Sequence, residues 1–87
     1  MMKLWGKLWK DNHMLRDTVI TIEDDDTRTH KIFRALDEIC LQFDLERPIW
    51  LESTIKDFQR RSKCRFGRDC FIEEKDFDYL ELQVLEE

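Results

Sequence analysis

Glycine and proline are scarce in this chain of 87 residues, which contains only Gly6, Gly67 and Pro48. Phosphate-binding loops need closely spaced glycines, so two widely separated ones exclude a loop of that kind. No apolar run approaches the ~20 residues that a membrane-spanning helix requires. Lysines and Gly6 interrupt the N-terminal apolar stretch, and no small-residue cleavage site follows it. We therefore expect neither a membrane partner nor a secretory signal, and cytoplasmic residence.

Cysteine is also sparse, with an odd number of three residues, Cys40, Cys64 and Cys70. This set does not form a disulfide framework. Zinc sites use closely paired Cys and His ligands, whereas His13 and His30 are isolated here. We expect reduced, structural thiols and no metal site. The cations around Cys64 favour a lowered thiol pKa, so a redox role for Cys64 with Cys70 is a remote alternative.

The composition fits one small folded domain over residues 1–87. Apolar residues make up 41% of the chain, which supplies material for a core, and charged residues make up 40%. The formal net charge of −5 argues against a dedicated nucleic-acid binder, because phosphate contacts dominate that affinity.

The N-terminal stretch KLWGKLWKDNHML has two incompatible interpretations. As a helix, it places Leu4, Trp5, Leu8 and Trp9 on one face, which is the pattern of a basic amphipathic segment on a membrane surface. As a strand, it alternates leucines on one side with lysines and tryptophans on the other.

Residues 18–22 favour the strand, because they are β-branched throughout and need a neighbouring strand. We therefore predict a hairpin with a two-residue turn at Asp11-Asn12. The cross-strand neighbours in that register would be Leu8 with Leu15, Leu4 with Val19, Trp9 with Met14 and Lys7 with Arg16. The first three pairs are apolar, whereas the last places two cations opposite each other.

Two helices should follow. Asp26 or Thr27 can cap the first, and its apolar residues recur at three- and four-residue intervals. That stripe comprises Ile32, Phe33, Leu36, Ile39, Cys40 and Phe43. Pro48 separates this helix from a shorter one at 52–62, whose predicted inner face is Leu51, Ile55 and Phe58. Trp50 is expected to pack against the core.

The C-terminal residues 79–86 alternate apolar and polar side chains, which predicts a half-buried strand with Leu80, Leu82 and Val84 inward. The predicted fold is α+β: a small, mainly antiparallel sheet in the order β-β-α-α-β, with two helices packed on one face. A short extra strand around Cys64 to Phe66 is an open alternative.

Four stretches, KLWGK…KDN, DDTRTHKIFRALDEIC, FDLERPIWLESTIKDF and RFGRDCFIEEKDFDYLELQV, together resemble a family of short bacterial proteins of unknown function. The resemblance covers nearly the whole chain. It implies a free-standing small protein, and it brings no activity, cofactor or functional residue with it.

The segment 56–68 contains six cations and one carboxylate, with two phenylalanines among them. Arginines bind phosphates, and aromatic rings stack on exposed bases. The polyanion-binding candidates are Arg60, Arg61, Lys63, Arg65 and Arg68. Alternatively, this segment is a solvated helix end, neutralised by the seven carboxylates of residues 73–87, or a patch for an acidic protein.

The strongest functional hypothesis concerns the side of the hairpin that carries tryptophan. If the leucines face the helices, the opposite side would display Trp5, Trp9, Met14 and Ile20. An apolar patch of this size, left in water, usually marks a partner surface, and the sheet could dimerise through it. The C-terminal loop or Trp50 could instead cover it.

No constellation of residues indicates catalysis. Carboxylate pairs such as Asp24/Asp25 and Asp76/Asp78 fit helix capping and strand-edge solvation, and no cleft is indicated. We therefore expect a non-enzymatic protein without a cofactor, which binds a protein partner or forms a homodimer.

Overall fold

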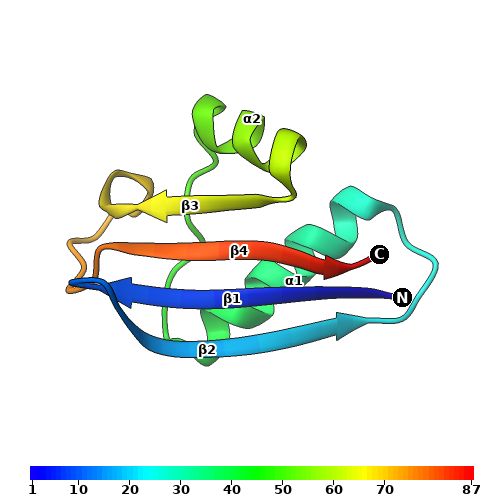
Figure 1. Ribbon diagram of the computed structural model, residues 1–87, viewed down its shortest axis with the longest axis horizontal. Helices are drawn as coiled ribbons and strands as arrows, with labels where there is room; N and C mark the ends of the chain where they lie inside the picture. The colour runs from blue at the N-terminus through cyan, green and yellow to red at the C-terminus, as the bar shows by residue number, and fades with distance from the viewer.

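The computed structural model describes residues 1–87 and contains one four-stranded antiparallel sheet, two α-helices and a single 3-10 turn (Figure 1). The elements in chain order are β1 (Met2–Lys10), β2 (His13–Ile22), α1 (Arg28–Gln42), α2 (Glu52–Arg61), β3 (Lys63–Gly67), η1 (Arg68–Cys70) and β4 (Tyr79–Glu86). The strands lie in the order β2-β1-β4-β3. The α+β class and the antiparallel sheet are confirmed, and β3 is the short strand that the sequence left open.

The N-terminal hairpin is confirmed, with Asp11 and Asn12 at its turn. Both residues have positive φ, 51° and 65°, as a tight two-residue hairpin turn requires, and Asp and Asn tolerate that conformation. Trp9 lies opposite Met14, as expected.

A β-bulge changes the predicted register beyond that pair. Leu8 lies opposite Arg16 and not Leu15, so Leu15 is an extra residue in β2. Every later side chain of β2 therefore points to the other face from the one predicted. Ile20 was expected beside the tryptophans, but it lies opposite Leu4 and is 9% exposed, in the core. Its place beside Trp5 is taken by Val19.

The bulge also removes the unfavourable charge pair of the predicted register. Lys7 lies opposite Asp17, and not opposite Arg16. The extra residue thus exchanges a pair of like charges for a pair of opposite charges, which stabilises the hairpin.

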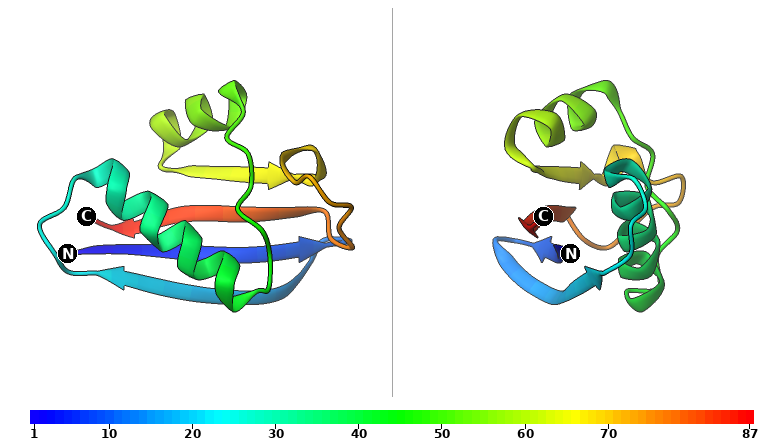
Figure 2. Two further views of the ribbon diagram at one scale, coloured as in Figure 1. Left: turned by 180° about the vertical axis from the view of Figure 1, so that it is seen from behind. Right: turned by 90° about the vertical axis from the view of Figure 1, so that its right-hand side faces the viewer.

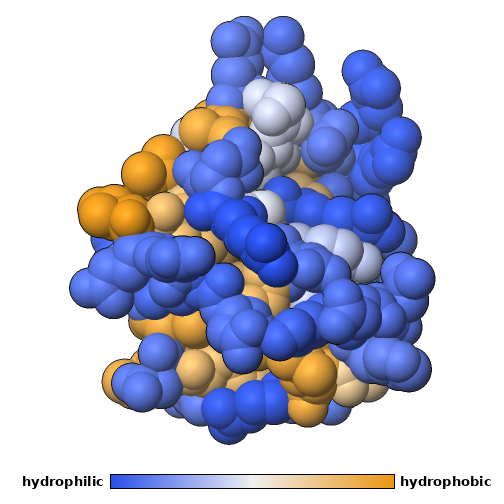
Figure 3. Space-filling view, turned by 90° about the vertical axis from the view of Figure 1, so that its left-hand side faces the viewer, coloured by the Kyte–Doolittle hydropathy of each residue, from blue (hydrophilic) through white to orange (hydrophobic).

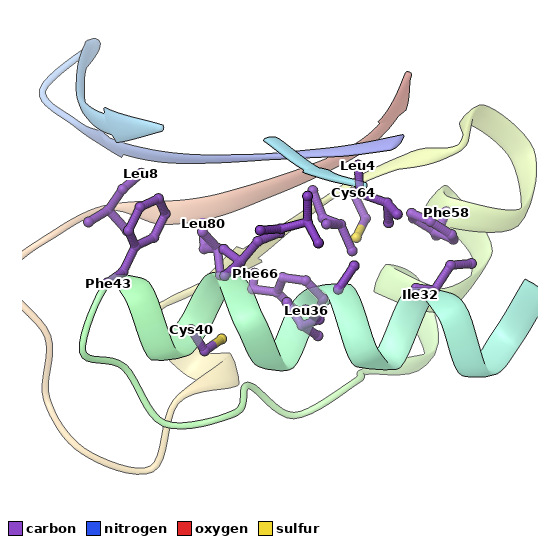
Figure 4. Close-up of a cluster of buried hydrophobic side chains, with 14 of the residues drawn as sticks. Leu4, Leu8, Ile32, Leu36, Cys40, Phe43, Phe58, Cys64, Phe66 and Leu80 are labelled. Atoms are coloured by element: carbon purple, nitrogen blue, oxygen red, sulfur yellow. The ribbon is translucent and has the colours of Figure 1, made fainter. Parts of the chain in front are cut away.

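Helix α1 covers one face of the sheet (Figure 2). Thr27 caps it by accepting a hydrogen bond from the His30 amide at 3.2 Å. The helix buries Ile32, Ala35, Leu36, Ile39 and Cys40. Figure 4 shows Leu36 of α1 beside Phe66 and Leu80 of the sheet, and Phe43, at the end of the helix, beside Leu8. Phe33, at 45% exposed, lies at the margin of the predicted stripe.

The end of α1 is held by two backbone hydrogen bonds. The Leu45 amide donates to the Cys40 carbonyl and the Asp44 amide to the Leu41 carbonyl, at 2.8 and 3.2 Å. This is the Schellman arrangement, and it requires a positive φ at Asp44, which is 56°.

We expect Asp44→Gly to raise the free energy of unfolding by about 0.5–1 kcal/mol, because glycine adopts this conformation without a steric penalty. Asp44 is exposed, so no packing is lost. Urea denaturation followed by circular dichroism measures the change. A decrease in stability would mean that the Asp44 side chain makes a contribution of its own.

Helix α2 lies along the outer edge of β3, beyond the sheet, and does not lie with α1 over the same face (Figures 1 and 2). Its buried residues are Thr54 and Phe58, whereas Ile55 of the predicted inner face is 41% exposed. Trp50 packs edge-on against Phe66, with ring centroids 4.8 Å apart. The expected core position of Trp50 is confirmed. Neither helix is long and apolar enough to cross a membrane.

Candidate functional site: the open face of the sheet

The face of the sheet opposite α1 is not covered by any other element of the chain (Figures 1 and 2). We call it the open face. Three rows of cross-strand neighbours run across it from β2 through β1 and β4 to β3. The rows are Val19–Trp5–Gln83–Lys63, Asp17–Lys7–Glu81–Arg65 and Met14–Trp9–Tyr79–Gly67.

A buried ion pair occupies the centre of the open face. Lys7 Nζ lies 3.0 Å from Glu81 Oε1, and the two side chains are only 9% and 5% exposed. Lys7 also donates a hydrogen bond to Gln83 Oε1 at 3.0 Å. Burial acts to raise the pKa of the Glu81 carboxyl, but the hydrogen bond and charge of Lys7, with help from Arg65, outweigh it and lower the pKa. Glu81 is therefore ionised at neutral pH.

Aromatic rings and Arg65 shield this ion pair from water. The Lys7 ammonium lies 4.0 Å from the centroid of the Trp5 ring, a favourable cation–π geometry. The Trp5 indole N–H donates to Asp17 Oδ2 at 2.9 Å, which fixes the ring over the hairpin. On the other side, Arg65 Nε lies 3.4 Å from Glu81 Oε2.

Three side chains, those of Trp9, Tyr79 and Arg65, form a stack that begins in the third row and ends in the second. The Trp9 and Tyr79 rings are stacked with centroids 6.3 Å apart, and the Arg65 guanidinium lies 4.6 Å from the Tyr79 centroid. The face of the Tyr79 ring is thus already engaged by groups of the same chain. A ring covered in this way favours contact with the complementary surface of a protein over stacking of unpaired nucleic-acid bases.

Three of the four predicted interface residues lie on the open face: Trp5, Trp9 and Met14. Met14 is 44% exposed, and Val19, which replaces Ile20, is 48% exposed. Trp50 cannot cover this face, because it packs on the α1 side against Phe66. Sequence reasoning missed Tyr79 and Arg65 as members of the face, because their positions depend on pairings of distant strands.

The predicted basic segment divides into paired and unpaired cations. Arg68 lies 3.0 Å from Asp78, and Arg65 pairs with Glu81, so the acidic C-terminal segment neutralises these two. Arg60, Arg61 and Lys63 have no carboxylate within ion-pair distance. A hollow of about 240 Å³ is lined by Asp57, Arg61, Lys63, Cys64, Arg65 and Glu81.

The end of the molecule that carries the hairpin turn is mostly hydrophilic, with apolar groups in separate small patches (Figure 3). Lys10 contacts Asp76 there at 2.7 Å, and the Asp11 amide donates to Asp78. These contacts attach the loop before β4 to the hairpin. The charged side chains of Lys10, Asp76 and Asp78 at this end are therefore paired with groups of the same chain.

Cys64 is not the activated thiol that its cationic neighbours suggested. Alternate residues of β3 point to opposite faces, so Cys64 enters the core while Lys63 and Arg65 point away from it. Burial, reinforced by the charge of Asp57, raises the pKa of the Cys64 thiol to about 12. Burial likewise raises the pKa of Cys40 to about 11. A buried neutral thiol is a poor nucleophile.

These raised pKa values make the protein less stable in alkali. Unfolded thiols ionise near pH 9.0, whereas folded Cys40 and Cys64 ionise near 11 and 12. Between these limits the folded state holds more protons, so we expect the free energy of unfolding to fall by about 1.4 kcal/mol per pH unit for each thiol. Urea denaturation at pH 8, 9 and 10 measures the slope, and Cys64→Ala should reduce it. An unchanged slope in Cys64→Ala would contradict the assignment.

A second hollow, of about 290 Å³, lies between α1 and α2. It is lined mainly by Arg28, Ile32, Phe33, Trp50, Ile55 and Phe58. Arg28 is engaged there by Glu87 and by the Phe58 ring. No group of three or more His, Cys, Asp or Glu side chains is placed to hold a metal ion.

No protein-family model, curated protein or solved structure matches the chain in the comparisons with known proteins. The resemblance to a family of short bacterial proteins therefore stays a prediction.

Proposed function

We propose that this protein is a non-enzymatic binding protein that associates with another polypeptide through the open face of its sheet. The observation that carries the proposal is the presence of three half-buried rings, Trp5, Trp9 and Tyr79, on the two central strands of a face that no helix covers. Met14 and Val19, which lie beside Trp9 and Trp5, are 44% and 48% exposed. We also propose cytoplasmic residence, because the three free thiols suit a reducing compartment.

The composition of the open face supports a protein partner. Tryptophan, tyrosine and arginine are the residues most enriched at the energetic centres of protein interfaces. Here Trp9, Tyr79 and Arg65 form one ordered stack, with Met14 beside Trp9. Rings held in place before binding lose little conformational entropy when a partner arrives.

The charges of the open face also favour a protein as the binding partner over a polyanion. Lys7 and Arg65 are each paired with Glu81 of the same chain, and Lys63 is the one cation of the three rows without a paired carboxylate. A phosphate backbone would meet two cations already neutralised by an internal partner, and the net charge of −5 would oppose it.

The double substitution Trp5→Ser/Trp9→Ser tests the proposal. Proteins retained by the immobilised chain, further copies of the chain included, should be lost when both rings are removed. The matched control is Leu41→Ser/Ile72→Ser, which removes two apolar side chains that are 74% and 83% exposed and lie elsewhere. Circular dichroism establishes that both variants fold. If a folded Trp variant retains the same proteins as wild type, the proposal is abandoned.

A second candidate function is nucleic-acid or phosphate binding through the basic segment. It is favoured by the unpaired state of Arg60, Arg61 and Lys63, and by the position of Lys63 in the same row as Trp5. This function requires salt-dependent binding of single-stranded RNA that is lost in Arg60→Glu/Arg61→Glu. Absence of binding at low salt would eliminate it.

A further inference from the structure

We infer that the polypeptide bound by the open face is a second copy of the same chain, packed face to face. This inference rests on the proposed function and names its partner. The charges of the central row alternate in sign across the sheet, and this order makes the face complementary to itself.

The central row runs Asp17, Lys7, Glu81, Arg65 from β2 to β3, and its signs are negative, positive, negative, positive. A two-fold rotation about an axis parallel to the strands brings a second open face over the first and reverses this order. Asp17 then faces Arg65 of the second copy, and Lys7 faces its Glu81. Every charge in the row meets one of opposite sign.

If the strands of the two copies are to be aligned, as in most stacked sheets, the other possible two-fold axis runs across the strands. That rotation leaves the order of the strands unchanged, so Asp17 would face Asp17 and Arg65 would face Arg65. Like charges placed opposite each other at an interface cost several kcal/mol. The charge row therefore selects the axis parallel to the strands.

The outer charges are the ones available to a partner. Lys7 and Glu81 satisfy each other in the buried centre. The Arg65 side chain contacts Glu81 only through Nε and is 63% exposed, which leaves its terminal nitrogens for a partner. Asp17 accepts from Trp5 through Oδ2 and is exposed at the opposite edge, which leaves its other oxygen. The dimer would therefore gain two equivalent ion pairs, Asp17 with Arg65 of the second copy and the reverse.

The aromatic row is complementary to itself under the same rotation. It runs Met14, Trp9, Tyr79, Gly67, so Trp9 faces Tyr79 of the second copy and Met14 faces its Gly67. Trp9, the bulkiest side chain of the row, thus meets the Tyr79 ring. Met14, at the edge of the sheet, meets Gly67, which has no side chain. Stacked sheets usually pack with their strands about 30° apart, close to the aligned arrangement assumed here.

The size of the face suits a stable dimer. A standard interface takes roughly 800 Å² from each partner, about one seventh of the 5625 Å² that the chain exposes. Strands at ~4.8 Å spacing and ~3.3 Å per residue give β1 and β4, with 9 and 8 residues, and their neighbours a face of about 25 by 20 Å. That is a projected area of roughly 500 Å², to which the relief of the standing side chains adds.

Charge reversal gives a test that depends on this orientation. Asp17→Arg and Arg65→Asp should each raise the dimer dissociation constant by about tenfold or more, because like charges then face each other. An equimolar mixture of the two variants should associate again, since every reversed residue then faces an opposite charge. Sedimentation equilibrium measures all three samples beside wild type.

Folding is checked by circular dichroism, because Asp17 accepts the Trp5 hydrogen bond and Arg65 packs on Tyr79. If a reversal does not fold, Asp17→Asn and Arg65→Gln replace it, and each should weaken the dimer severalfold. A monomeric wild type, unchanged association in the variants, or a mixture that stays monomeric overturns the inference. Capture of a different protein that depends on Trp5 and Trp9, by a monomeric chain, would overturn it while leaving the proposed function intact.

Discussion

Lys7→Met is expected to lower the free energy of unfolding by about 3–5 kcal/mol, because it leaves the Glu81 carboxylate buried without its main partner. The Glu81 side chain is 5% exposed, and only Arg65, at 3.4 Å, remains near it. A domain of this size has a total stability of about 5 kcal/mol. The variant should therefore be close to unfolded at room temperature, as urea denaturation followed by circular dichroism would show.

Two controls separate burial from the mere loss of an ion pair. Lys3→Met removes the cation from a pair with Glu86 whose side chains are 41% and 54% exposed, and should cost less than about 1 kcal/mol. Lys7→Met/Glu81→Leu removes both buried charges and should recover most of the stability. Equal losses for Lys7→Met and Lys3→Met would contradict the burial argument.

The pH dependence of the same pair has a definite sign. The pKa of Glu81 is lowered in the folded state, so its contribution to stability is complete above the unfolded value near 4.5 and is lost as the pH falls through the folded pKa. In Lys7→Met, burial raises the pKa of Glu81, so this carboxylate is protonated at a higher pH than in wild type. Protonation removes the penalty of burying an unpaired charge. The difference in stability between wild type and Lys7→Met should therefore shrink towards pH 4.

Gly6→Ala is expected to cost about 1–3 kcal/mol, although a methyl group is the smallest side chain that can be added. A Cβ atom at Gly6 would lie 2.6 Å from Cγ2 and 2.9 Å from Cδ1 of Ile39. Ile39 is completely buried in α1, so it has little room to move. Gly6 leaves space on β1 for the Ile39 side chain of α1, and urea denaturation measures the effect of filling that space.

A double-mutant cycle tests whether Ile39 causes this cost. Ile39→Ala alone should cost about 2–5 kcal/mol through the cavity that it leaves. In that background, the penalty of Gly6→Ala should fall by about 1 kcal/mol or more. Gly67→Ala is the matched control, because its Cβ would meet only the far end of the Asp69 side chain, Oδ1, at 3.0 Å. Additive effects at Gly6 and Ile39 would exclude a direct clash.

Most of the fold could be predicted from local patterns. The β-branched run at 18–22, the cap at Thr27 and the alternation at 79–86 each act within a few residues, and the expected elements are present. The hairpin register could not be predicted beyond Trp9, because the bulge at Leu15 depends on how the whole sheet packs. That single extra residue moved Ile20 into the core and placed Val19 on the open face.

The candidate site was predictable only in part, for a related reason. Trp5 and Trp9 alternate within one strand, so their common face followed from the sequence. Tyr79 and Arg65 join them through pairings that span most of the chain. The lowered pKa suggested for Cys64 was wrong, because neighbours in sequence point to opposite sides of a strand and its cationic neighbours do not share its environment.

The most direct measurement is sedimentation equilibrium of wild type beside Trp5→Ser/Trp9→Ser, both established as folded by circular dichroism. Self-association through the open face requires wild type to sediment at twice the 10.8 kDa mass of one chain, and the variant at the mass of a single chain. A folded variant that sediments at the same mass as wild type would contradict self-association through this face.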